Sequence, residues 1–288
     1  MRGNGLRKEV EMETEEALGL LVDVKWLSRH LGDPDLCLVD ARTGDDYYKG
    51  HIPSALPLDV YQYILSDTSL PAVEEYVRLM EVVLSQMGVE RHKTVVFYEE
   101  DAGMHAARGV WLLEWMGHND AHMLDGGFRA WRQANLPTSL INPLPDVRRA
   151  YFRAKLEPER LATFQDVLDR LQKPGVAILD VRSPAEYYSE EVRAARGGAI
   201  PGAVHIEWSE ALDKEGCLRP LGELESLYRG KGITKDKEII TYCQGGFRAA
   251  HTYLALRLLG YPKVRNYIGS WREWGNRQDL PLEVPKRG

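Results

Sequence analysis

The chain has 288 residues, of which 44% are hydrophobic and 28% are charged, so it is long enough for two domains of ordinary size. A formal net charge of −6 argues against a nucleic-acid-binding surface, and no window approaches the ~20 apolar residues of a membrane span. Three cysteines without a C-x-x-C pair suit neither a disulfide scaffold nor a metal site, so we expect a reducing, cytoplasmic location and no metal.

The chain begins with a charged segment and is divided near its middle by a proline-rich one. Residues 1–17 lack an apolar stretch of the signal-peptide kind, which favours a disordered leader or a cloning remnant. Residues 136–157 contain three prolines and no clear period, which is typical of a linker. We therefore expect an N-terminal domain at 18–135 and a C-terminal domain at 158–288.

The C-terminal half alternates apolar runs with helical patterns. One helix is predicted over 249–259, because its apolar positions have helical spacing and Gly260 follows it. Strands are predicted at 176–181, 203–208, 238–243 and 264–268. This alternation predicts an α/β fold with a parallel sheet covered by helices on both faces.

The two halves are copies of one fold. Asp40 and Arg42 of the first half recur as Asp180 and Arg182 of the second. Four further segments recur in the same order, with eight extra residues in the second copy between 189 and 197. A repeat of this length is a whole domain, so the sequence predicts two tandem domains.

One cysteine of the second copy lies in an unusual setting. Cys243 ends a β-branched apolar run, and the loop after it contains Gly245 and Gly246 and ends in Arg248. Backbone amides of a short loop and of a helix N-terminus converge on one point there and favour negative charge. Since the thiolate is the reactive form of cysteine, Cys243 is predicted to be a nucleophile.

The first copy lacks this nucleophile. Tyr98 matches Tyr242, but Glu99 and Glu100 follow it, and His105 stands where the second copy has Arg248. The first loop is one residue longer, so either glutamate can be the equivalent of the cysteine. Acidic side chains would repel anions, so we expect the first domain to be catalytically inactive at this position.

The chain resembles the tandem rhodanese-type sulfurtransferases, which use thiosulfate or 3-mercaptopyruvate. The resemblance rests on the Asp-x-Arg and Ile-Pro-x-Ala motifs of both halves, on the loop from Cys243 to Arg248 after Tyr242, and on the turn at 269–271. It implies two domains, each with a parallel sheet of about five strands and helices on both faces. It also implies transfer of a sulfane sulfur through a cysteine persulfide, without a cofactor.

The resemblance and the chemistry together give a set of site residues. Cys243 is the expected catalytic nucleophile, and no general base is required because the thiolate itself attacks. Arg248 supplies a cation for the donor anion, and Glu186 stands where some relatives have a second substrate arginine and is a possible partner of Arg248 or Arg182. The substrate-binding residues are predicted to be Arg248, Gln244, Gly245, Gly246, Phe247, Arg182 and Glu186.

Several alternatives remain open at this stage. The donor is expected to be a small anion, thiosulfate rather than 3-mercaptopyruvate, and the acceptor cyanide or a thiol. A protein sulfur carrier of the same family is a second possibility. A phosphatase-like loop would place five residues between cysteine and arginine, whereas four separate Cys243 from Arg248. The protein is expected to be a monomer or a weak dimer.

A few other residues invite interpretation. Cys37 is expected in a core, Cys217 in a turn, and Trp271 and Trp274 in the core or the cleft wall. Arg182 also has a structural interpretation, because it recurs as Arg42 in the inactive half. Arg193 and Arg196 are predicted in a solvated loop or as anion guides. His251 is predicted at the surface or as a helix cap.

Overall fold

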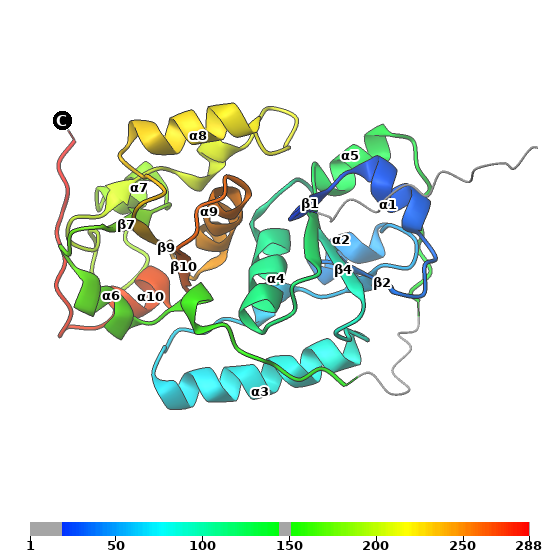
Figure 1. The fold of residues 1–288 in the computed structure, drawn as a ribbon, viewed down its shortest axis with the longest axis horizontal. Coiled ribbons are helices and arrows are strands. Elements are labelled where there is room, and N and C mark those ends of the chain that lie inside the picture. The colour runs from blue at the N-terminus through cyan, green and yellow to red at the C-terminus, as the bar shows by residue number, and fades with distance from the viewer. Residues whose placement is uncertain (1–18, 144–150, 288) are drawn as a thin grey trace, which may run out of the picture.

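The computed structural model describes residues 19–143 and 151–287. The predicted leader, 1–17, and the middle of the predicted linker lie outside the described residues. Two α/β units follow each other along the chain, each with its own sheet (Figure 1). Within the described residues, no helix is long and apolar enough to cross a membrane.

Within residues 19–143, the first unit contains five strands and five α-helices. They are β1 (Leu21–Val22), α1 (Val24–His30), β2 (Leu36–Asp40), α2 (Gly44–Tyr48), β3 (Leu56–Pro57), α3 (Leu70–Gln86), β4 (Thr94–Tyr98), α4 (Met104–Trp115), β5 (Ala121–Leu124) and α5 (Gly127–Gln133), with a 3₁₀ turn η1 (Val60–Gln62).

The second unit repeats this order. Its elements are β6 (Leu161–Ala162), α6 (Phe164–Arg170), β7 (Val176–Asp180), α7 (Pro184–Tyr187), β8 (Val204–His205), α8 (Leu221–Gly230), β9 (Glu238–Tyr242), α9 (Phe247–Leu258), β10 (Val264–Tyr267) and α10 (Ser270–Trp274), with 3₁₀ turns η2 (Pro158–Arg160) and η3 (Trp208–Ala211).

Both sheets are entirely parallel and have equivalent strand orders, β1-β5-β4-β2-β3 and β6-β10-β9-β7-β8. The predicted α/β class with tandem five-stranded parallel sheets is therefore confirmed. β4 and β9 are the central strands, and each is buried from its second residue onward. Ligand sites of such sheets lie beyond the carboxyl ends of the strands, so the residues after Tyr98 and Tyr242 are placed where a site is expected.

The predicted strands agree with the structure except in length, but the predicted helix begins too late. The strand expected over 203–208 pairs only at Val204–His205 and then turns into η3. Helix α9 begins at Phe247, two residues before the predicted start, because Gly246 adopts a left-handed conformation and caps it. Arg248 therefore lies in the first turn of α9 and not in the loop before it.

The two units are joined by a buried interface. Helices α4 and α9 pack side by side at the centre of the molecule (Figure 1), and one apolar core contains residues of both units. Polar contacts cross the same interface: Glu114 accepts from the phenol of Tyr253 at 2.9 Å, and Glu273 accepts from the backbone and the hydroxyl of Thr68. The two units are thus held together by apolar packing at α4 and α9 and by hydrogen bonds between buried polar side chains.

The described end of the predicted linker is bound to the first unit. The backbone amide of Phe152 donates to Ser85 at 3.0 Å, and that of Ala154 donates to Glu81 at 2.9 Å, both on α3. Residues 152–154 thus lie along α3, and the amides of Lys155 and Glu157 then donate to the carbonyls of Met116 and Trp115 at the end of α4 before the chain enters η2. Strand β6 then starts the second sheet beside β10.

Candidate active site at the end of β9

Cys243 lies directly after the central strand β9, at the N-terminus of α9. Its sulfur accepts a hydrogen bond from the backbone amide of Gly246 at 3.1 Å, and its own amide donates to the hydroxyl of Ser270 at 3.1 Å. The side chain is almost fully buried, with 1% of the residue exposed. A sulfur held against helix N-terminal amides is in the setting that favours a negative charge.

The two glycines of the loop have different roles. Gly246 has φ +83°, and a Cβ there would lie 2.8 Å from the backbone oxygen of Ile268. Gly246 is therefore required both by its conformation and by the lack of space. Gly245 has no positive φ, and a Cβ there would meet only Arg272 Nε at 3.9 Å. Of the two predicted glycines, only Gly246 is demanded by the geometry.

Arg248 is held in a two-pronged ion pair with Glu186 of α7. Arg248 Nη1 lies 2.5 Å from Glu186 Oε2, and Nη2 lies 2.9 Å from Oε1. The predicted partnership of these residues is confirmed. Burial would raise the pKa of Glu186, but hydrogen bonds and charge from Arg248 outweigh it, and the pKa is lowered to about 2. Both residues are charged at neutral pH, and Glu186 together with Cys243 raises the pKa of Arg248 despite its burial.

The guanidinium of Arg182 is bound by neighbouring groups of the fold. Its guanidinium pairs with Asp180 at 2.6 Å, donates to the carbonyl of Gly198 at 2.7 Å and stacks 4.5 Å from the ring of Trp271. Arg42 makes the equivalent contacts with Asp40 and the carbonyl of Gly50 in the first half. The recurrence favours a structural role for Arg182, which ties the end of β7 to the turn before β8.

The side chains of Gln244 and Phe247 make their contacts with other segments of the chain. Gln244 Nε2 donates to the carbonyl of Arg193 at 2.9 Å. The ring of Phe247 lies against the first unit, 5.2 Å from the ring of Tyr61 and 5.8 Å from that of His105. Gln244 thus connects the Cys243 loop to the extra segment of the second copy by a hydrogen bond. Phe247 packs in the interface between the units.

The extra segment of the second copy is ordered by its arginines. Arg193 lies 3.4 Å from Glu186, so it belongs to the charge cluster around Arg248. Arg196 instead donates to the carbonyls of Trp274 and Leu280 at 3.0 and 2.9 Å. The prediction of a solvated loop is therefore wrong for Arg196, because its guanidinium satisfies backbone carbonyls of the chain beyond α10.

Two residues of this region were missed or misplaced by sequence reasoning. Ser270 has φ +52°, unusual for a residue with a side chain, and its buried hydroxyl bridges the Cys243 amide and the Tyr267 carbonyl. The sequence signal for Ser270 was the repeated turn at 269–271.

His251 is fully buried, and its Nε2 donates to the carbonyl of Ala102 at 3.0 Å. The expected surface position is wrong because α9 packs against α4. Cys37, Trp271 and Trp274 are buried, as expected, and Cys217 lies in the expected turn, between the bridged residues Leu212 and Leu218.

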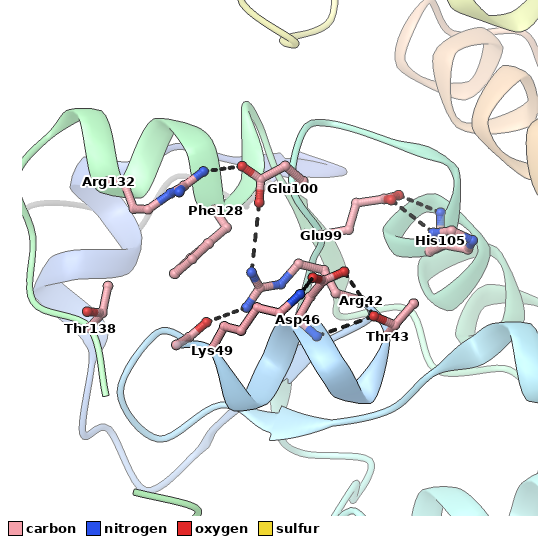
Figure 2. Close-up of a pocket in the computed structure, with 11 residues that line it drawn as sticks. Arg42, Thr43, Asp46, Lys49, Glu99, Glu100, His105, Phe128, Arg132 and Thr138 are labelled. Atoms are coloured by element: carbon pink, nitrogen blue, oxygen red, sulfur yellow. Dashed lines mark hydrogen bonds and ion pairs between the residues drawn. The ribbon is translucent and has the colours of Figure 1, made fainter. Parts of the chain in front are cut away.

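The first unit shows which glutamate replaces the cysteine. The carbonyl of Glu99 accepts from Phe128 N at 2.7 Å, as that of Cys243 accepts from Trp271 N at 2.9 Å. Glu99 is thus the equivalent of Cys243, and the extra residue follows Glu100. The Glu99 carboxylate accepts from the amides of His105 and Ala106 and from His105 Nδ1 (Figure 2).

The anion cup of the first unit is therefore filled by its own side chain. A cavity of about 550 Å³ lies beside it, lined among others by Arg42, Lys49, Arg132 and Glu100. Figure 2 shows Arg132 and Arg42 both directed at Glu100, while Glu99 turns toward His105. Each charge in this cavity thus has an opposite charge next to it, unlike a cup prepared for an external anion.

Known proteins resemble both halves of the chain. The rhodanese-like domain family matches residues 23–134 and again 163–277. A thiosulfate sulfurtransferase of Azotobacter vinelandii is 37% identical over 95% of this chain and all of that protein. The sulfur carrier protein TtuD of Thermus thermophilus is 34% identical, over 91% of this chain and 96% of its own length.

A mercaptopyruvate enzyme is also similar in sequence and in structure. The 3-mercaptopyruvate sulfurtransferase of Escherichia coli is 33% identical over 92% of this chain and 98% of its own. The crystal structure of SseA from Escherichia coli, described as a 3-mercaptopyruvate sulfotransferase, has a TM-score of 0.75 and 31% identity, covering 88% of this chain and 99% of that one.

Proposed function

This chain belongs to the rhodanese-like family, with two copies of the domain, and we propose that it is a sulfurtransferase that carries a sulfane sulfur as a persulfide on Cys243. The observation that carries the proposal is the position of the Cys243 sulfur, 3.1 Å from the amide of Gly246 at the N-terminus of α9. A thiolate and a persulfide are both anions, so the same amides favour both resting forms of the enzyme.

The reaction proceeds in two displacements. The Cys243 thiolate attacks the outer sulfur of thiosulfate, a new S–S bond forms, and the old S–S bond breaks with its electron pair leaving on sulfite. An acceptor, cyanide or a thiolate, then attacks the terminal sulfur of the persulfide, and the Cys243 thiolate leaves with its electron pair. Splitting the transfer in this way predicts ping-pong kinetics.

We propose thiosulfate as the donor, with Arg248 as the cation that receives its oxygens. The geometry adds a condition, because Glu186 occupies both terminal nitrogens of Arg248. The donor therefore has to compete with an internal carboxylate for the guanidinium. Relatives named thiosulfate sulfurtransferase support this donor, whereas the similarity to the Escherichia coli enzyme supports 3-mercaptopyruvate as the alternative.

We assign the chemistry to the C-terminal domain, 158–288, and a supporting role to the N-terminal domain, 18–135. The filling of the first cup by Glu99 supports this division. Gln244, Gly246 and Phe247 shape the loop, whereas Arg182 acts at a distance by fixing the strand end. A cytoplasmic location would keep Cys243 reduced. Transfer to a partner protein is the second candidate, supported by the similarity to the sulfur carrier TtuD.

Intact-protein mass spectrometry after incubation with thiosulfate tests the proposal. We expect a gain of one sulfur atom, removed again by cyanide with formation of thiocyanate. Cys217→Ser is the matched control, since Cys217 is the most accessible of the three cysteines. The gain should persist in Cys217→Ser and vanish in Cys243→Ser. No sulfur adduct with either thiosulfate or 3-mercaptopyruvate would overturn the assignment.

A further inference from the structure

Arg108 of α4 is a buried cation without an acidic partner. Only 1% of the residue is exposed; its Nη2 donates to the phenol of Tyr76 at 3.2 Å, and its Nη1 is buried with no hydrogen-bond partner. In the part of the chain that the structure describes, no carboxylate forms an ion pair with it. A guanidinium stays protonated in proteins, so its charge needs compensation within the fold.

The aromatic neighbours of Arg108 supply part of that compensation and show where it lies. Its guanidinium carbon is 4.5 Å from the ring centre of Trp111 and 5.4 Å from that of Phe247. Phe247 is the first residue of α9, so Arg108 crosses from the first unit to the base of the Cys243 loop. Burial lowers the pKa of Arg108, and the phenol of Tyr76 and the charge of Cys243 oppose that effect.

The internal repeat gives independent evidence for this placement. Arg108 and His251 are equivalent, since each follows the matched Ala-Ala pair at the start of its helix. His251 reaches across the interface and donates to Ala102, in the loop that begins at Glu99. Because α4 and α9 pack against each other as equivalent helices, Arg108 occupies the equivalent place, with its guanidinium carbon 5.4 Å from the ring of Phe247 in the segment that follows Cys243.

The other charges around Cys243 largely cancel. Arg248 is paired with Glu186, to which Arg193 also lies close, so the positive charge of Arg248 is already matched. Arg108 and Arg272 of α10 are the cations near this loop that form no ion pair within the described residues, and of the two only Arg108 is fully buried. The anion available to balance it is the thiolate of Cys243, or the persulfide that replaces it.

We propose that Arg108 is the buried counter-cation of Cys243, supplied across the interface by the domain that has no nucleophile. This role rests on the persulfide chemistry proposed above and gives the inactive copy a function in catalysis. Arg108 acts as a charge-balancing residue: it favours the anionic sulfur without contacting the donor. The pairing also explains why α4 retains a buried arginine whose equivalent on α9 is a neutral histidine.

The test measures how fast iodoacetamide alkylates Cys243 as a function of pH, by intact mass, in a Cys37→Ser, Cys217→Ser background. Arg108→Met should move the midpoint of the rate profile to higher pH by about one unit and slow alkylation at pH 7 by about tenfold. Arg108→Lys should stay close to the parent. Arg257→Met is the matched control, because Arg257 lies at the same interface but is paired with Glu114.

Coincident profiles for the parent and Arg108→Met would overturn the proposal. Alkylation needs no sulfur donor, so this result is independent of whether thiosulfate forms a persulfide. If the methionine variant does not fold, Arg108→Gln, which can still bond to Tyr76, replaces it.

A double-mutant cycle provides a readout without any chemistry at the sulfur. Cys243→Ala should lower the free energy of unfolding at pH 8.5 more in the parent than in Arg108→Met, because only the parent retains a cation that loses its anion. Equal losses in both backgrounds would show that the two residues are not coupled and would also overturn the proposal.

Discussion

At the scale of single residues, the position of one glycine controls the geometry of the sulfur. The backbone amide of Gly246 donates to the sulfur of Cys243. The positive φ of Gly246 would strain the backbone of any residue that has a side chain. Gly245, its neighbour, has neither property. The two glycines, adjacent and identical in sequence, therefore form a matched pair for mutation.

Gly246→Ala is expected to destabilise the protein by about 1–3 kcal/mol and to lower the rate of persulfide formation more than tenfold. The physical reason is the close approach of the added Cβ to Ile268, which shifts the amide away from the sulfur. Gly245→Ala should stay within about 0.5 kcal/mol of the parent. Urea unfolding and single-turnover mass spectrometry measure both quantities. Equal losses in the two variants would contradict this account.

The Glu186–Arg248 pair sets the second residue-scale prediction. Glu186→Gln should lower the KM for thiosulfate severalfold, because the donor no longer competes with a carboxylate for Arg248. Steady-state kinetics with cyanide as acceptor measure this change. Glu191→Gln is the control, since Glu191 is exposed on the neighbouring segment and does not contact Arg248. An increase in KM in Glu186→Gln would mean that the pair orients Arg248 for the donor instead.

The same pair contributes to stability in a defined pH range. The pKa of Glu186 is about 2 in the folded protein, below its ordinary value of 4.5. The unfolded chain therefore takes up this proton first, so the contribution is complete above about pH 4.5 and is lost as the pH falls toward 2. Glu186→Gln should remove this part of the acid dependence in urea unfolding measured between pH 7 and 3.

At the scale of elements, the equivalent helices α4 and α9 present their N-termini to different charges. The N-terminal amides of α4 are occupied by the carboxylate of Glu99, whereas those of α9 face a thiol. An internal carboxylate satisfies helix amides permanently and adds stability at a helix start. The first copy thus satisfies its helix N-terminus internally, whereas the second copy leaves the equivalent amides to the sulfur that we propose carries the persulfide.

Glu99→Gln should therefore lower the free energy of unfolding by about 1 kcal/mol while persulfide formation on Cys243 remains unchanged. Glu100→Gln is the matched control: its carboxylate is 43% exposed and pairs with Arg132 at the surface, so its loss should be smaller. Thermal unfolding and the sulfur-adduct assay measure the two effects. A loss of sulfur loading in Glu99→Gln would show that the first cup takes part in the reaction.

At the scale of the whole molecule, the interface between the units contains a pH-sensitive group. His251 is fully buried against the first unit, and burial, opposed only partly by the bond to Ala102, lowers its pKa to about 4. The unfolded histidine titrates near 6.5, so the unfolded state binds more protons between these values. Stability should fall as the pH drops from about 6.5 to 4, by up to about 1.4 kcal/mol per pH unit.

His251→Gln should flatten this dependence, since glutamine can still donate to Ala102 but does not titrate. Urea unfolding at pH 7, 6 and 5 measures the slope. His92→Gln is the control, because His92 is 60% exposed and makes no contact across the interface. An unchanged slope in His251→Gln would assign the acid sensitivity to another group.

The sequence by itself determined the duplication and the parallel α/β fold, and it predicted Cys243 as the nucleophile. These features follow from local sequence patterns. The patterns are the internal repeat, the spacing of apolar residues, the turn residues between them, and a cysteine between a buried strand and a glycine-containing loop. The asymmetry between the copies was also visible, because a thiol and a glutamate at equivalent positions cannot share one chemistry.

Only the tertiary structure decided which charges meet. Whether Glu99 or Glu100 replaces the cysteine depends on strand register, and the burial of His251 depends on how α4 packs against α9. The placement of Arg108 beside the loop of the other domain likewise depends on residues far apart in the chain. Local sequence does not encode such contacts, because they arise from the packing of two whole domains, which brings distant side chains within the range of their charges.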